Sequence, residues 1–182
     1  MLKALLARSI RAFERRYDYD MGYGHALLSA SLPGFLRFLA VTSLSPRPDG
    51  VPPAAWYAAK IAATMHGDCG PCTQLVIRMA ADAAVPGATL RAVVAHDLSA
   101  LDADTALGLR YATAVLTRTA ELPALQADVL ARWGARGLAS LALAVTAASL
   151  FPTLKVALGH GHACSLAGVD AALAAADAAR AG

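Results

Sequence analysis

The chain has 182 residues, of which 57% are hydrophobic and 16% are charged, and its formal net charge is +3. A chain of this length can bury a core without disulfides or metal ions. Its 16 basic and 13 acidic side chains are scattered, and no basic run is interleaved with aromatic residues, so the sequence gives no support to nucleic-acid binding. Three cysteines are too few for an extracellular disulfide framework and favour a cytosolic redox or metal-binding pair.

Alanine and leucine dominate the composition, and the β-branched and aromatic residues that favour strands are sparse. We therefore predict an all-α protein, formed by a single helical domain over residues 1–182. N-terminal helices are expected over 1–45, a core over 53–155 and a helical tail over 156–182. The apolar surplus exceeds what one small monomer covers, so we expect a homo-oligomer.

The N-terminal segment 1–17 has apolar residues at helical spacing, interrupted by arginines, and predicts an amphipathic helix rather than a signal peptide. A glycine-containing turn is expected over 17–24. Helical spacing resumes over 25–44, where Pro33 is placed to open a new helix. Segment 45–53, which is rich in proline, is the clearest loop.

The core is predicted to consist of helices joined by short turns. A helix is expected to begin near Pro53 and end at Gly67, and the next begins at the CGPC motif. Asp102 or Asp104 is placed to cap a later helix. The expected core and tail helices cover 53–67, 69–84, 85–97, 102–118, 122–134, 138–154 and 169–182.

Residues 138–154 form the most apolar stretch of the chain. Its length lies at the short end of the roughly 17–25 residues that a membrane span needs. Serine and threonine recur within it, Pro152 is expected to break it near its end, and Lys155 follows. We predict a central helix that is buried in the core or between subunits, and no membrane insertion.

The motif Cys-Gly-Pro-Cys, residues 69–72, carries the clearest chemical signal. With Pro71 in a first helical turn, Cys69 lies at the helix N-terminus, where free backbone N–H groups and the helix dipole favour a thiolate. Cys72, one turn away, can close a disulfide with little motion. This placement predicts a pair that cycles between dithiol and disulfide.

Other interpretations of the pair remain open at this stage. A CxxC can form half of a zinc site, although the chain has no second CxxC or CxxH at suitable spacing. Two inert core cysteines are also possible. A thioredoxin fold needs a strand before the motif, whereas the preceding segment "WYAAKIAATM" is alanine-rich with helical spacing.

A CxxC at the start of one helix, directly after another helix in an all-α chain, resembles the alkylhydroperoxidase D and carboxymuconolactone decarboxylase superfamily. The segments "LDADTALGLRYATAVL" and "ADVLARWGARGLASLALAVTAASLFPTLK" are similar to the later helices of that family. The resemblance covers Pro53 to Lys155. It implies an alkylhydroperoxidase D-like helical bundle that assembles into trimers or hexamers, and a cysteine peroxidase without a cofactor in the redox branch.

The resemblance also implies a proton relay, and here the chain departs from the family. The family's redox branch has a glutamate twelve residues before the first cysteine and a histidine four residues after the second. Tyr57 and Val76 stand at these two places. The two cysteines carry over to Cys69 and Cys72, and the relay residues do not.

Other polar residues near the motif are candidates for the missing relay. His66 has a side chain suited to proton transfer near neutral pH or to stabilising a thiolate, and also suits the C-terminus of a helix. Asp68 suits an N-terminal cap better than a base. Tyr57, Lys60 and Gln74 are weaker candidates, and Tyr57 also suits ordinary packing.

A second group of candidate ligands lies in "GHGHACS", where His160, His162 and Cys164 alternate along the chain. On a helix these side chains point to different faces, whereas an extended segment would place them on one face that could bind a metal. A polar helix end, an approach to the CxxC site and a metal site all remain open. His25 and His96 are interpreted as surface or interface histidines.

These observations predict a cytoplasmic thiol-dependent peroxidase or disulfide oxidoreductase. Its substrate would be a peroxide or a disulfide, and an external dithiol would act as reductant. Two alternatives remain: a cofactor-free enzyme acting on a small carboxylic or lactone substrate, and a non-catalytic metal-binding or redox-sensing helical oligomer.

Overall fold

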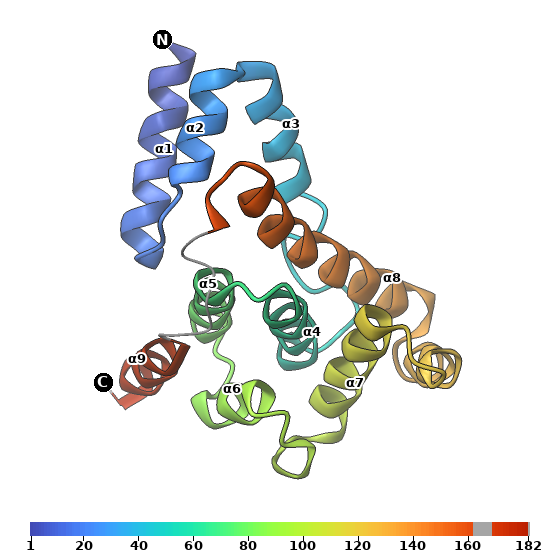
Figure 1. Ribbon diagram of the computed structural model, residues 1–182. Coiled ribbons are helices and arrows are strands. Elements are labelled where there is room, and N and C mark those ends of the chain that lie inside the picture. The colour runs from blue at the N-terminus through green and yellow to red at the C-terminus, as the bar shows by residue number, and fades with distance from the viewer. Residues whose placement is uncertain (162–168, 182) are drawn as a thin grey trace.

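In a computed structural model the chain is described over residues 1–161 and 169–181, and within these ranges it contains helices and no strand (Figure 1). This confirms the predicted all-α class. The elements are α1 (Leu2–Tyr17), α2 (Gly22–Ala30), α3 (Leu32–Thr42), α4 (Pro53–His66), α5 (Gly70–Asp82), α6 (Gly87–Val94), the short 3₁₀ turn η1 (Leu98–Ala100), α7 (Ala103–Thr117), α8 (Leu122–Ala157) and α9 (Val169–Ala181).

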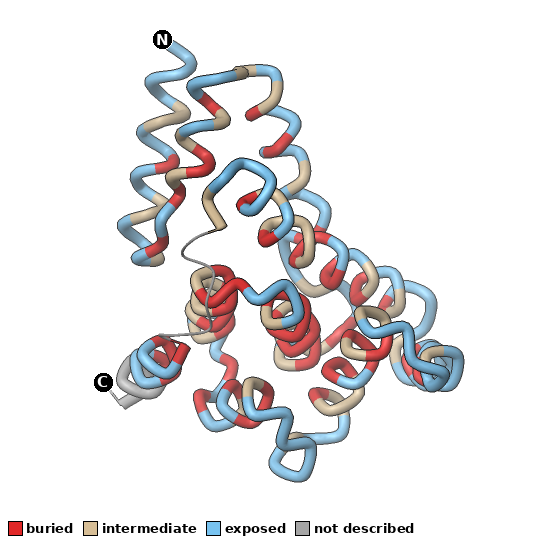
Figure 2. Tube along the Cα trace, viewed as in Figure 1, coloured by how far each residue is buried: buried red, intermediate tan, exposed pale blue. Residues whose placement is uncertain are grey.

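Helix α4 lies at the centre of the main core, and α5, α6, α7 and α8 all pack against it (Figure 1). It is buried on most of its circumference (Figure 2). Five alanines on this helix are almost fully buried: Ala55, Ala58, Ala59, Ala62 and Ala63. Small side chains let neighbouring helices come close from several directions, so α4 can form the axis of the bundle.

Helix α7 approaches α4 most closely at Gly108. A Cβ atom added there would lie 2.5 Å from the carbonyl oxygen of Ala55 and 2.9 Å from its carbonyl carbon. Both are backbone atoms of a central helix, which a side-chain rotation cannot move aside. The close contact of these two helices therefore requires a glycine at position 108.

Helices α1, α2 and α3 enclose a second hydrophobic cluster, whose buried members include Ile10, Phe35 and Phe38. Its contact with the rest of the molecule runs through α8, where the ring centroid of Phe151 lies 5.9 Å from that of Phe38. Leu75 of α5 also packs against this cluster. The N-terminal helices thus form one wall of a space whose other walls belong to α4, α5 and α8.

Helix α8 is interrupted at Gly134, where the backbone adopts φ 69° and ψ −174°. This break matches the boundary predicted between segments 122–134 and 138–154, since glycine tolerates a positive φ. The expectation that Pro152 would break the second segment was wrong, because the helix continues to Ala157. Pro152 is buried, and its packing offsets the backbone hydrogen bond that a proline removes.

Within the described parts of the chain, α8 is the single helix long and apolar enough to cross a membrane, judged by length and composition alone. Of its apolar window, 44% is buried inside the structure. Leu141, Ala144 and Val145 belong to the main core. The part of α8 that was predicted to be a central helix therefore lies in the core.

Several local predictions can be compared with the structure. Ser31 caps α3 and Pro33 lies in its first turn, as expected for a new helix at this proline. Asp102 caps α7, and its carboxylate accepts from the Thr105 N–H at 2.9 Å. The turn expected over 17–24 is shorter than predicted, because α2 already begins at Gly22. The tail is helical over α9, as predicted, and this helix packs on α5 and α6.

The contact at Gly108 predicts an unusual result for a glycine-to-alanine change inside a helix. Such a change ordinarily stabilises a helix by up to about 1 kcal/mol. Gly108→Ala would instead force α4 and α7 apart, and we expect it to lower the free energy of unfolding by about 2 kcal/mol or more. Urea unfolding followed by circular dichroism measures this difference. A gain in stability would show that the two backbones can separate at little cost.

Candidate active site

The CGPC motif lies at a tight junction between α4 and α5. Asp68 adopts a left-handed conformation with φ 47°, and Cys69 occupies the N-cap position of α5. The Cys69 N–H donates to the Thr64 carbonyl at 3.2 Å. Pro71 stands in the first turn of α5, where a missing N–H costs nothing. The motif therefore begins a helix, as predicted.

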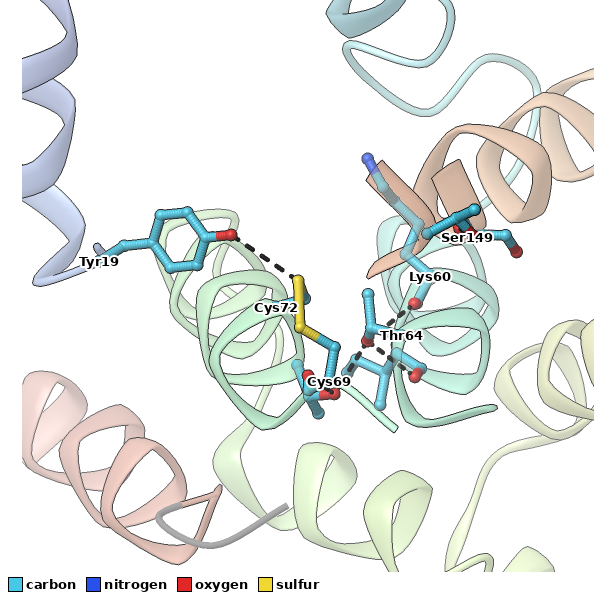
Figure 3. The surroundings of a disulfide bond; sticks show 9 residues. Tyr19, Lys60, Thr64, Cys69, Cys72 and Ser149 are labelled. Atoms are coloured by element: carbon cyan, nitrogen blue, oxygen red, sulfur yellow. Dashed lines mark hydrogen bonds between the residues drawn. A yellow bond between two sulfur atoms is a disulfide. The ribbon is translucent and has the colours of Figure 1, made fainter. Parts of the chain in front are cut away.

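Two threonines join the helices on either side of this junction. The Thr73 hydroxyl lies 3.1 Å from the Thr64 hydroxyl and 3.0 Å from the Cys69 carbonyl, and it can donate to either (Figure 3). The Thr64 hydroxyl in turn donates to the Ile61 carbonyl at 3.0 Å. Both threonines are buried. These bonds fix the first turn of α5, and with it both cysteines, against α4.

The two sulfurs are paired as a disulfide, with a Cα–Cα distance of 5.3 Å (Figure 3). They differ in their surroundings. Cys69 has no exposed surface, whereas Cys72 is 3% exposed and lines a cavity. A molecule that enters this cavity therefore meets the Cys72 sulfur.

Tyr19, from the segment between α1 and α2, reaches the same sulfur. Its hydroxyl oxygen lies 3.7 Å from the Sγ of Cys72 (Figure 3). The ammonium group of Lys155 lies over the rings of Tyr19 and Tyr23, at 5.2 and 5.6 Å from their centroids. Burial raises the pKa of Tyr23 to about 12, although its hydrogen bond with Tyr19 acts in the opposite direction.

Sequence reasoning missed Tyr19, because 53 residues separate it from Cys72. Arg78 on α5 holds its segment in place by donating to the carbonyls of Tyr17 and Asp18 and to the Asp18 carboxylate at 3.1 Å. Tyrosine and aspartate alternate in "YDYD", and this pattern predicted a polar turn. Nothing in that pattern indicates which helix the turn contacts.

The cavity has a volume of about 560 Å³ and lies between the N-terminal helices and the core. This size falls within the range of small-molecule sites. Most of its lining is apolar, and none of the lining residues is acidic. The site can therefore admit an apolar molecule to a redox-capable sulfur.

Lys60, from the middle of α4, is the cationic residue in the lining. Its ammonium group lies 4.3 Å from the centroid of the Trp56 ring and donates to the Ser45 carbonyl at 3.3 Å. Burial lowers its pKa from 10.5 to about 8. Among the residues that the structure describes, no carboxylate pairs with it.

The residues predicted as relay candidates occupy different places. Tyr57 lines the cavity, and burial raises the pKa of its hydroxyl. Val76, which stands where the family resemblance implies a histidine, also lines the cavity. His66 and Asp68 are exposed and lie outside the cavity lining, so the structure does not bring them together with Cys72. Asp68 does not cap α5 as expected, because Cys69 holds the N-cap position and makes no side-chain cap.

The C-terminal candidates are only partly within the described chain. His160 is among the described residues, and its backbone N–H donates to the Lys155 carbonyl at the end of α8. His162 and Cys164 lie outside the described residues. Over 1–161 and 169–181, no group of three or more His, Cys, Asp or Glu side chains could hold a metal ion. His96 is exposed, and His25 lies 3.2 Å from the Glu14 carboxylate.

No family model, curated protein or solved structure matches this chain. The resemblance to the alkylhydroperoxidase D superfamily stays a prediction, drawn from the motif and the order of the helices. The chemistry of the site has to be argued from its own geometry.

Lys60 should make the stability of the protein depend on pH. Because its pKa is lower in the folded protein than in the unfolded chain, folding must desolvate an ammonium group below about pH 8. That cost disappears as the pH rises from about 8 to 10.5, since the unfolded chain then loses the same proton.

The variant Lys60→Met removes the charge and keeps an apolar side chain of similar length. We expect it to be more stable than the wild type at neutral pH, by up to about 3 kcal/mol. The difference should shrink as the pH rises from 8 to 10.5. Urea unfolding of both proteins over this range measures it. A difference that stays constant would show that Lys60 titrates at its ordinary pKa.

Proposed function

We propose that this protein is a thiol-dependent peroxidase or disulfide oxidoreductase in which Cys72 meets the substrate and Cys69 completes the disulfide. The observation that carries the proposal is the asymmetry of the two sulfurs. Cys72 lines an apolar cavity of about 560 Å³, whereas Cys69 is fully buried behind it. A redox pair next to a cavity is a reactive arrangement, while two inert core cysteines would have no such access.

With a hydroperoxide, the thiolate of Cys72 attacks the terminal oxygen and the O–O bond breaks. The sulfur becomes a sulfenic acid, and the other oxygen leaves as an alkoxide that takes a proton to give an alcohol. The Cys69 thiol then condenses with the sulfenic acid, which forms the disulfide and releases water. An external dithiol reduces this disulfide by exchange and is itself oxidised to a disulfide.

Tyr19 takes the place of the relay that the family resemblance implies. In the reduced protein its hydroxyl, 3.7 Å from Sγ in the disulfide form, can donate to the Cys72 thiolate and favour the ionised sulfur. The Lys155 ammonium lies over the Tyr19 ring and brings a positive charge close to that side chain. Both groups favour an anion at Cys72.

We also propose a cytoplasmic homo-oligomer, a trimer or a hexamer by the resemblance. Large apolar side chains are exposed on several helices, which supports burial between subunits. The exposed examples on α1, α3 and α8 are Leu2, Leu5, Leu36, Leu39, Leu130, Leu143 and Val156. Light scattering coupled to size-exclusion chromatography determines the assembly.

Replacing each of the two cysteines in turn should give different reaction products with a hydroperoxide. In a Cys164→Ser background, Cys69→Ser should form a sulfenic acid at Cys72 that reacts with dimedone after one equivalent of organic hydroperoxide. Cys72→Ser should leave Cys69 unlabelled and abolish peroxide reduction. Mass spectrometry of the adducts and a dithiol-coupled assay measure both. Dimedone labelling of Cys69 would reverse the assignment, and activity that survives both changes would favour the cofactor-free enzyme.

Removing the Tyr19 hydroxyl should weaken the Cys72 thiolate. We expect Tyr19→Phe to raise the pKa of this thiol by about one unit and to slow its oxidation about tenfold at neutral pH. The rate of alkylation against pH, measured in Cys69→Ser, gives the thiol pKa. Tyr57→Phe is the matched comparison, because it removes another hydroxyl from the cavity wall. Equal shifts in the two variants would mean that Tyr19 acts only through the polarity of the cavity.

A further inference from the structure

One wall of the cavity gathers hydrogen-bond donors that lack acceptors. The indole nitrogen of Trp56 and the hydroxyl of Ser45 are buried, and neither finds a hydrogen-bond partner among the residues described. Both residues line the cavity, and Lys60 contacts both of them. Buried polar groups in folded proteins are nearly always satisfied, so these two atoms mark the surroundings of Lys60 as the polar part of the cavity wall.

The positive charge of Lys60 at this wall calls for a ligand. The Lys60 ammonium can donate three hydrogen bonds, and among the described residues it makes one, to the Ser45 carbonyl. A partly buried cation without a carboxylate partner is costly. A carboxylate group accepts several hydrogen bonds and supplies the missing negative charge, so one such group can pair with the Lys60 ammonium.

The remainder of the cavity is apolar. Its lining is drawn from six helices and includes these large hydrophobic residues: Leu6, Ile10, Phe13, Phe35, Phe38 and Phe151. A polar ligand would leave this surface unused, whereas an alkyl chain or an aromatic body would bury it. The cavity thus combines one anion-binding wall with a long apolar wall.

The cavity also has a route to solvent near Lys60. Its lining includes exposed residues, among them Leu39, Thr42 and Pro46, at the end of α3 and in the following loop. Ser45, which accepts from Lys60, is the neighbour of Pro46. A molecule with an ionised end can therefore keep that end close to water while its apolar part enters the cavity.

We infer that the cavity binds an apolar carboxylic acid, with its carboxylate held by Lys60 beside Ser45 and Trp56 and its apolar body against the phenylalanines and leucines of the N-terminal helices. Trp56, Lys60 and Thr64 are spaced by one turn on the same face of α4. This face leads from the anion-binding wall to the junction where Thr64 contacts the CxxC helix (Figure 3).

That the bound acid is also the substrate, as a hydroperoxide of such an acid, rests on the proposed function. The binding itself rests only on the cavity. Binding and reaction can be tested separately with a ligand that cannot react. Dodecanoate below its critical micelle concentration is suitable. Dodecanol is the neutral comparison, and it is the more apolar molecule, so an unspecific apolar cavity would prefer it.

Isothermal titration calorimetry on the full chain measures both ligands. We expect dodecanoate to bind about tenfold more tightly than dodecanol at neutral pH. Lys60→Met should reverse this preference. Lys3→Met is the matched control, because it removes an exposed lysine outside the cavity and should keep the preference.

The outcomes separate the two proposals. Equal or tighter binding of dodecanol by the wild type would overturn the inference, and so would a preference for dodecanoate that survives in Lys60→Met. Preferential binding in a protein that reduces no hydroperoxide would support this inference while refuting the proposed function.

Discussion

The close packing around α4 is the constraint on which the other features of the structure depend. Its buried alanines let four neighbouring helices approach, and Gly108 brings the α7 backbone against Ala55. A central helix held on most sides cannot easily rotate or shift. Trp56, Lys60 and Thr64 all project from this helix, so their relative positions are as fixed as the core itself.

The site combines this rigid axis with a second, smaller hydrophobic cluster. The main core supplies the CxxC helix and the lysine, and the N-terminal helices supply the apolar wall and Tyr19. Arg78 ties the two parts together, because it extends from α5 to the backbone that precedes Tyr19. The cavity exists because the two clusters meet along an incompletely filled boundary.

The chemistry proposed for the site follows from the burial of two sets of groups, the paired sulfurs and the Lys60 side chain with its neighbours. One sulfur of the pair faces the cavity and the other does not, which gives the two cysteines different roles. One lysine lies partly desolvated beside two polar groups that have no hydrogen-bond partner among the described residues, so one wall of the cavity is polar and the remainder is apolar. Reaction at one place and recognition at the other then need no residue from the exposed surface near His66 and Asp68.

The sequence by itself determined the helical class, most helix boundaries and the position of the CxxC pair at a helix start. Those features depend on local spacing, caps and glycines, as at Asp102 and Gly134. Only the tertiary structure decided which groups surround the cysteines. Tyr19 reaches Cys72 through a contact between distant segments, and Lys60 loses its solvent through packing. Local spacing contains no information on such contacts, so proximity along the chain pointed to His66 and Asp68, which the fold leaves exposed.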